Sequence, residues 1–203
     1  MISLIIITYN QCSLLQKQLP LMLNQSGIDF DVIVVDKNSD DETLTLLEQL
    51  EAEHTDLRHI ILPTTAHSIN KDHLAVMLGV RAATWDRVIV TRPQCQPKSD
   101  SWLKDTVEAW PEDREILLLP TFQGKKPTLR QRFAINMAKH GHARWALGHA
   151  LGYHRRLFMQ SGGFPARTPQ KMATMTILVR YYSNQYNTCV LDDAKYSLHS
   201  VVS

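Results

Sequence analysis

One stretch decides the fold: Val32-Ile33-Val34-Val35-Asp36-Lys37-Asn38-Ser39-Asp40-Asp41-Glu42-Thr43. It begins with apolar, β-branched residues, which are typical of a strand covered on both faces. Its polar second half is rich in residues that cap helices, and leucines at helical spacing follow over residues 44–50. The stretch therefore predicts a strand, a polar turn and a helix in succession, which is the beginning of a βαβ unit.

The same alternation continues on both sides of this stretch. Apolar runs predict strands at residues 2–8, 31–36, 57–62, 87–91 and 115–119. Apolar residues at helical spacing predict helices at residues 14–22, with an interruption at Pro20, and at 44–50, 73–83 and 102–110. Residues 120–127 predict a loop into a less regular carboxy-terminal third. Strands that alternate with helices favour an α/β fold with a mainly parallel central sheet flanked by helices.

The composition is that of one soluble globular domain. The chain has 203 residues, of which 44% are hydrophobic and 21% charged. A formal net charge of +2 provides no strong field, so nucleic acid is not expected as a partner. No apolar run approaches the roughly 20 residues that a membrane-spanning helix needs. Cys12, Cys95 and Cys189 form no CxxC pair, which favours reduced thiols and a cytoplasmic location, with peripheral contact to the inner membrane left open.

Polar residues follow three of the predicted strands directly. In a parallel sheet, ligands bind outside the carboxyl ends of the strands, so these residues are the candidates for substrate binding. They are Thr8, Tyr9 and Asn10 at the end of the first strand, Asp36 and Lys37 at the end of the second, and Arg92 and Gln94 after the fourth. The first strand is not followed by GxGxxG, and GxxxxGK[ST] is absent, so dinucleotide and P-loop sites lack their fingerprints.

These residues resemble a known family. Residues 3–10, Ser-Leu-Ile-Ile-Ile-Thr-Tyr-Asn, together with residues 32–43, look like the opening of family 2 glycosyltransferases, which have the GT-A fold. Further motifs of that family match Leu78 to Ala83, Cys95-Gln96-Pro97, Trp102-Leu103 and the segment from Gly148 to Gly163-Phe164.

The resemblance runs from Ile2 to about Tyr182. It implies a single Rossmann-like, nucleotide-diphospho-sugar transferase domain over residues 1–203. In this domain residues 1–119 would bind the nucleotide sugar and residues 120–203 would face the acceptor.

The family's chemistry is the transfer of a sugar from a nucleoside diphosphate sugar to an acceptor hydroxyl. The resemblance implies Mn²⁺ or Mg²⁺ on the diphosphate, held by a D-x-D turn after the fourth strand. It also implies a general base in an E-D pair after G-G-F, and an acid in a V-D-D stretch that recognises uracil.

This chain departs from the family at each of these positions. Asp36 remains, but the second acid of V-D-D is Lys37. The two acids of D-x-D fall on Arg92 and Gln94, and arginine cannot ligate a cation. Residues 165–176, after G-G-F, contain no acid. We therefore expect no metal ligands, no cofactor and no identified catalytic residue.

Two hypotheses about function follow. In the favoured one, this copy is catalytically impaired and acts as a binding or scaffolding module in polysaccharide synthesis, beside a partner glycosyltransferase or as a homo-oligomer. In the alternative, it is an active, metal-independent transferase in which Arg92 and Lys37 clamp the diphosphate. A carboxylate beside Arg92 would bear on the choice between them.

Basic residues in the carboxy-terminal half have two interpretations. Lys125-Lys126 and Arg130 with Arg132 could attract an acidic or phospholipid-linked acceptor, but a solvated loop and helix face is the simpler explanation.

Overall fold

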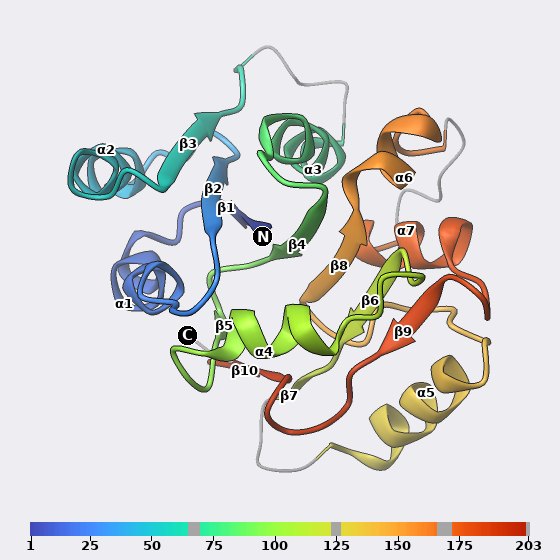
Figure 1. Cartoon of the computed structure of the whole chain (residues 1–203). Coiled ribbons are helices and arrows are strands. Elements are labelled where there is room, and N and C mark those ends of the chain that lie inside the picture. The colour runs from blue at the N-terminus through green and yellow to red at the C-terminus, as the bar shows by residue number, and fades with distance from the viewer. Residues whose placement is uncertain (65–69, 123–126, 166–171, 202–203) are drawn as a thin grey trace.

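The computed structural model of the chain describes residues 1–64, 70–122, 127–165 and 172–201. Within these residues, a seven-stranded sheet has the order β3-β2-β1-β4-β8-β6-β9 (Figure 1). Its strands are β1 (Ile2–Thr8), β2 (Phe30–Asp36), β3 (Leu57–Ile61), β4 (Arg87–Thr91), β6 (Ile116–Leu119), β8 (Ala150–His154) and β9 (Thr188–Val190). β1 to β4 pair in parallel, β8 runs antiparallel to β4 and β6, and β9 is parallel to β6.

A three-stranded sheet carries the described carboxyl end back toward β4. It consists of β5 (Cys95–Gln96), β10 (Leu198–Ser200) and β7 (Thr121–Phe122), with β10 in the middle. The amide of Val201 donates to the carbonyl of Gln94 at 2.9 Å. The described carboxyl end of the chain therefore pairs with the turn that follows β4.

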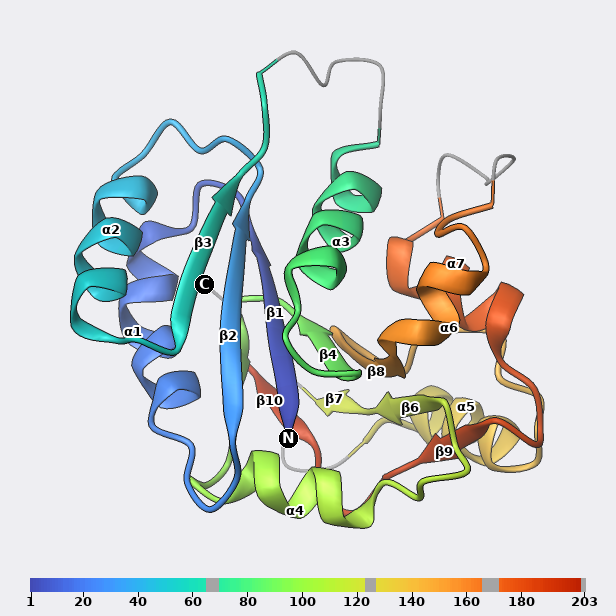
Figure 2. The same ribbon diagram turned by 45° about the horizontal axis from the view of Figure 1, so that its top comes forward.

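Helices cover both faces of the sheet. They are α1 (Cys12–Leu23), α2 (Thr43–Glu53), α3 (Lys71–Ala82), α4 (Trp102–Ala109), α5 (Leu129–Lys139), α6 (Arg155–Gln160) and α7 (Thr174–Tyr182). Figure 2 shows α1 and α2 on one side of β1, β2 and β3, and α3 on the other.

Successive residues of β1 point into two different cores. Leu4 and Ile6 belong to the core under α1, α2 and α4, whereas Ile5 and Ile7 belong to the core under α3. Gly79 of α3 lies so close to β1 that an added Cβ would stand 2.5 Å from Cγ2 of Ile5. Burial on both faces explains why the strands are continuous apolar runs.

The structure confirms the predicted fold and corrects three details. The five predicted strands are present within one residue at each end. The interruption at Pro20 was wrong, because α1 continues through it to Leu23, with Leu19 and Met22 buried in the core. The loop predicted over 120–127 contains strand β7, and residues 123–126 lie outside the described residues. The part that follows is also more regular than expected, since it includes α5, α6, α7 and β8 to β10.

Candidate functional site

The predicted binding residues of β1 and β2 meet at one edge of the sheet. Thr8 and Asp36 are register partners, and the amide of Lys37 donates to the carbonyl of Thr8 at 3.0 Å. The Tyr9 ring is exposed, and Nζ of Lys37 lies 5.5 Å from its centroid. These four residues therefore lie together at the carboxyl ends of β1 and β2, beside the amino-terminal end of α3.

Hydrogen bonds of Asp36 and Asn10 connect the loops that follow β1 and β2. The buried Asp36 carboxylate accepts hydrogen bonds from the amide and the hydroxyl of Ser39. The same hydroxyl accepts from the amide of Asn10 at 2.8 Å, and Oδ1 of Asn10 accepts from the amide of Asp40 at 3.0 Å. Asn10 and Asn38 have φ of 50° and 67°, a left-handed conformation that asparagine tolerates better than most residues. Asp36 therefore positions the two loops.

A carboxylate that the sequence did not predict lies between the two predicted cations. Oδ1 of Asp72 accepts from Nζ of Lys37 at 2.9 Å, and Oδ2 accepts from Nη2 of Arg92 at 3.1 Å. We call these residues the Lys37–Asp72–Arg92 triad. The three side chains are 18% (Lys37), 30% (Asp72) and 27% (Arg92) exposed, so solvent screens the pairs only in part.

The pKa of Asp72 reflects these contacts. Burial alone raises the pKa of this carboxyl, but the hydrogen bonds and charges of Lys37 and Arg92 outweigh it. The net result is a pKa below the ordinary value of an aspartate, so Asp72 is ionised at neutral pH.

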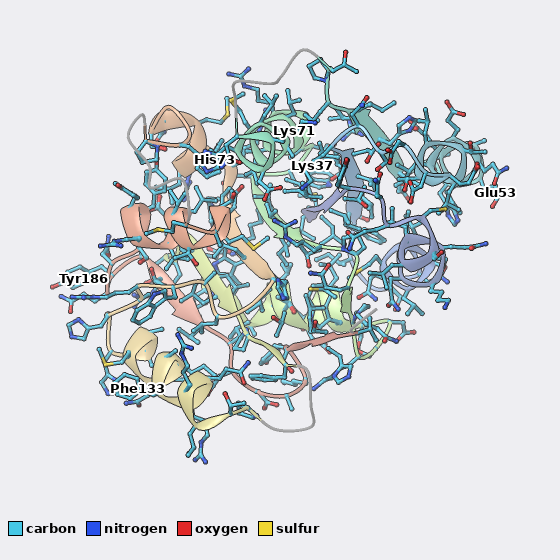
Figure 3. The ribbon with its side chains drawn as sticks, turned by 180° about the vertical axis from the view of Figure 1, so that it is seen from behind. Lys37, Glu53, Lys71, His73, Phe133 and Tyr186 are labelled. Carbon is cyan, nitrogen blue, oxygen red and sulfur yellow. The ribbon has the colours of Figure 1, made fainter. Side chains whose placement is uncertain are left out.

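The start of α3 places Asp72. Oδ1 of Asn70 accepts from the amides of Asp72 and His73 at 3.0 and 3.2 Å, which caps the helix. Figure 3 shows Lys37, Lys71 and His73 gathered around this end of α3. In the sequence, Asp72 could have been singled out as an acid in the first turn of a helix that follows a capping asparagine.

The G-G-F segment reaches the same end of α3. The rings of His73 and Phe164 are stacked, with centroids 4.1 Å apart and planes at 9°. Burial lowers the pKa of His73, and the nearby Asp72 charge offsets this only in part, so the imidazole is neutral at pH 7. The stack thus connects the start of α3 with the G-G-F segment.

The turn after β4 lies near His149, which directly precedes β8. Burial, and secondarily the charge of Arg92, lower the pKa of His149. His149 lines a cavity of about 680 Å³ together with Arg130, Phe133 and Trp145. Oε1 of Gln94 is buried and has no hydrogen-bond partner among the described residues.

The side chains beside β4 do not fit a divalent cation. Mn²⁺ and Mg²⁺ need several oxygen ligands, which usually include at least one carboxylate that is free to coordinate the ion. Here the turn offers a guanidinium and an amide, and each oxygen of Asp72 already accepts from a cation. In the described parts of the chain, no three His, Cys, Asp or Glu side chains come together as metal ligands would. The donor set thus disagrees with the metal that the resemblance implies.

The family follows from the sequence match. A sequence profile described as Glycosyl transferase family 2 matches residues 3–177. The chain belongs to this family. A search of curated proteins found no match.

Solved glycosyltransferases of this family share its fold. The structure is similar to a mannosyltransferase from Pyrobaculum calidifontis in complex with GDP-Man and Mn²⁺, with a TM-score of 0.78 and 18% identity over 100% of this chain and 57% of that one. It is also similar to S. aureus TarS 1-349 in complex with UDP, with a TM-score of 0.73 and 19% identity over 100% of this chain and 60% of that one. The chain thus spans less than two thirds of either relative.

The length and hydropathy of the described helices bear on membrane insertion. None of them is both long enough and apolar enough to pass through a bilayer.

Proposed function

We propose that this protein binds a nucleoside diphosphate sugar in a cleft at the carboxyl ends of β1, β2 and β4, without a divalent cation. The observation that carries the proposal is the Lys37–Asp72–Arg92 triad, in which Arg92 falls on the first acid of the D-x-D turn that the resemblance implies. Asp72 holds the two cations side by side and leaves a net charge of +1. The remaining N–H groups of Arg92 and Lys37 suit the oxygens of a diphosphate.

We also propose that sugar transfer by the family's acid-dependent route is impaired. The chain has no aspartate or glutamate from residue 116 to residue 191, so the acceptor-side half offers no carboxylate as a general base there. Asp192, the first acid after this stretch, pairs with Lys139 at 2.7 Å. The protein would then act as a binding or scaffolding module in polysaccharide synthesis, with a partner glycosyltransferase or a second copy of itself.

Thermal unfolding with added ligands tests the binding proposal. We expect UDP, GDP or one of their sugars to raise Tm by about 3 °C or more at saturating concentration, equally with Mn²⁺ and with EDTA. The variant Arg92→Ala should lose this rise, whereas the matched surface variant Lys104→Ala should keep it. If none of these ligands raises Tm, or if they do so only with Mn²⁺, the proposal is wrong.

An active, metal-independent transferase is the second candidate. The position of His149 favours it, because this histidine lies within the electrostatic influence of Arg92 and lines the acceptor-side cavity. A neutral imidazole there would accept the proton of an acceptor hydroxyl as the sugar leaves the diphosphate. Release of UDP or GDP that depends on an acceptor, and that His149→Ala abolishes, would support this candidate over the first.

The location is part of the same proposal. The three cysteines are free thiols, which fits a reducing compartment. We place the protein in the cytoplasm, with contact to the inner membrane made from its surface.

A further inference from the structure

We propose that helix α5 and the adjoining Trp145 form a docking surface for an anionic lipid bilayer. The α5 surface consists of Leu129, Arg130, Arg132, Phe133 and Trp145. The inference deepens the proposed contact with the membrane, and it does not depend on nucleotide binding in the cleft.

The charge of the chain is divided very unevenly along the sequence. Residues 116–191 contain eleven lysines and arginines and no acid, which gives this stretch a formal charge of +11. The rest of the chain contains eleven lysines and arginines and twenty acids, which gives −9. The overall charge of +2 therefore conceals a basic and an acidic part, and a basic part of this kind attracts anionic surfaces.

The arginines of the α5 surface are available to an external anion. Arg130 and Arg132 are exposed, and within the described ranges neither forms an ion pair with a carboxylate. Lys139, at the other end of α5, differs from them because it pairs with Asp192. Since the surrounding stretch has no acid of its own, nothing within it neutralises these two arginines.

Large apolar side chains stand among these arginines. Leu129 is 83% exposed, Phe133 is 64% exposed and Trp145 is 54% exposed. Leu129 and Phe133 are four residues apart and so project from the same side of α5. Apolar and aromatic residues mixed with arginines are typical of helices that lie in the interface of a membrane. A polynucleotide would be attracted by the charge but would not explain an exposed leucine.

The helix that presents this surface is firmly built. Thr128 and Gln131 form a capping box, in which the Thr128 hydroxyl accepts from the amide of Gln131 and the Gln131 side chain accepts from the amide of Thr128. Ile135 and Ala138 anchor the opposite side of α5 in the protein. The exposed residues are thus held on a defined helix face.

The surface also opens into a cavity and lies across the molecule from the acidic helix α2. Phe133, Arg130 and Trp145 line the cavity of about 680 Å³, which gives an inserted lipid group a place beside a cation. In Figure 3, Phe133 on α5 lies at the opposite edge of the molecule from Glu53 on α2. Docking through α5 therefore turns the acidic α2 away from the membrane.

Flotation with lipid vesicles tests the proposal on the full chain. We expect the protein to float with vesicles in which about a third of the lipid is phosphatidylglycerol, and not with phosphatidylcholine alone. Binding should fall steeply between about 0.05 and 0.5 M salt, because surface charges are screened over a shorter distance. The double variant Arg130→Glu/Arg132→Glu should weaken partitioning about tenfold or more.

A second double variant separates the apolar part from the charges. Leu129→Ser/Phe133→Ser should also lose flotation, while Lys17→Glu and Met159→Ser, exposed residues of α1 and α6, should float like the original protein. Circular dichroism and nucleotide-induced stabilisation of the same variants show whether fold and cleft are intact. The proposal is overturned if anionic vesicles do not retain the protein at low salt, or if both α5 variants float unchanged. Retention on a polynucleotide without flotation would also overturn it.

Discussion

Lys37 and Arg92 in the amino-terminal half differ from Arg130 and Arg132 in the stretch from residue 116 to 191, because only the first two pair with a carboxylate among the described residues. In the amino-terminal half, Arg58 pairs with Asp31 at 2.5 Å, and Lys37 and Arg92 share Asp72. In the later stretch, Arg130 and Arg132 have no carboxylate partner among the described residues, and their own stretch of sequence contains none.

The difference separates two uses of positive charge. Cations that share a carboxylate inside a cleft are fixed in position, and an incoming diphosphate meets a prearranged pair of donors with a small net charge. Cations without a partner create a field outside the protein, which suits a large and less specific anion. The triad therefore suits a small anionic ligand, and Arg130 and Arg132 suit an extended anionic surface.

Removing the arginine of the cleft should have the largest effect. Arg92→Ala deletes charge-assisted hydrogen bonds to the diphosphate, each worth about 1.5–3 kcal/mol, so the affinity for UDP or GDP should fall about tenfold to a hundredfold. Isothermal titration calorimetry in EDTA measures this, with Lys104→Ala as the control. An unchanged affinity would show that the triad does not contact the diphosphate.

Removing the shared carboxylate should make the cleft resemble the basic half. Asp72→Asn leaves Lys37 and Arg92 without their counter-charge, so the affinity for a nucleoside diphosphate should rise about fivefold at low salt. The gain should shrink as salt is added. A loss of affinity instead would mean that Asp72 is needed chiefly to hold the two cations in place.

The stability contributed by the triad should depend on pH only within a narrow acidic range. The pKa of Asp72 is lower in the folded protein than the ordinary value of about 3.9 in an unfolded chain. The stability that ionised Asp72 contributes is therefore present above about pH 4, and it is lost as the pH falls through the lower folded value. Urea unfolding of Asp72→Asn should lack this part of the acid dependence. If the free energy of unfolding fell with pH in parallel for the original protein and Asp72→Asn, this prediction would be contradicted.

The parts of the fold that local sequence determines could be predicted closely. β1 and β4 have the bounds that their apolar runs indicate, because strands buried on both faces admit few polar residues. The passage of α1 through Pro20 could not be predicted, since it depends on how Leu19 and Met22 pack in the core.

Prediction of the site from the sequence is limited in the same way, and to a greater extent. The positions of Lys37 and Arg92 at strand ends were visible in the sequence, but their partner Asp72 is 35 and 20 residues away from them. No local pattern reports an ion pair over such separations. The stretch without acids, in contrast, can be read from the sequence. The net charge of the whole chain hides it, because acids elsewhere offset its basic residues.

The central claim is that Lys37 and Arg92, and not a metal ion, hold the diphosphate. The most direct measurement is calorimetric titration of the unaltered protein with UDP and with GDP, once in EDTA and once in Mn²⁺. We predict binding of at least one nucleotide with the same Kd in both conditions. Binding that appears only with Mn²⁺, or that Mn²⁺ tightens about tenfold or more, would contradict the account.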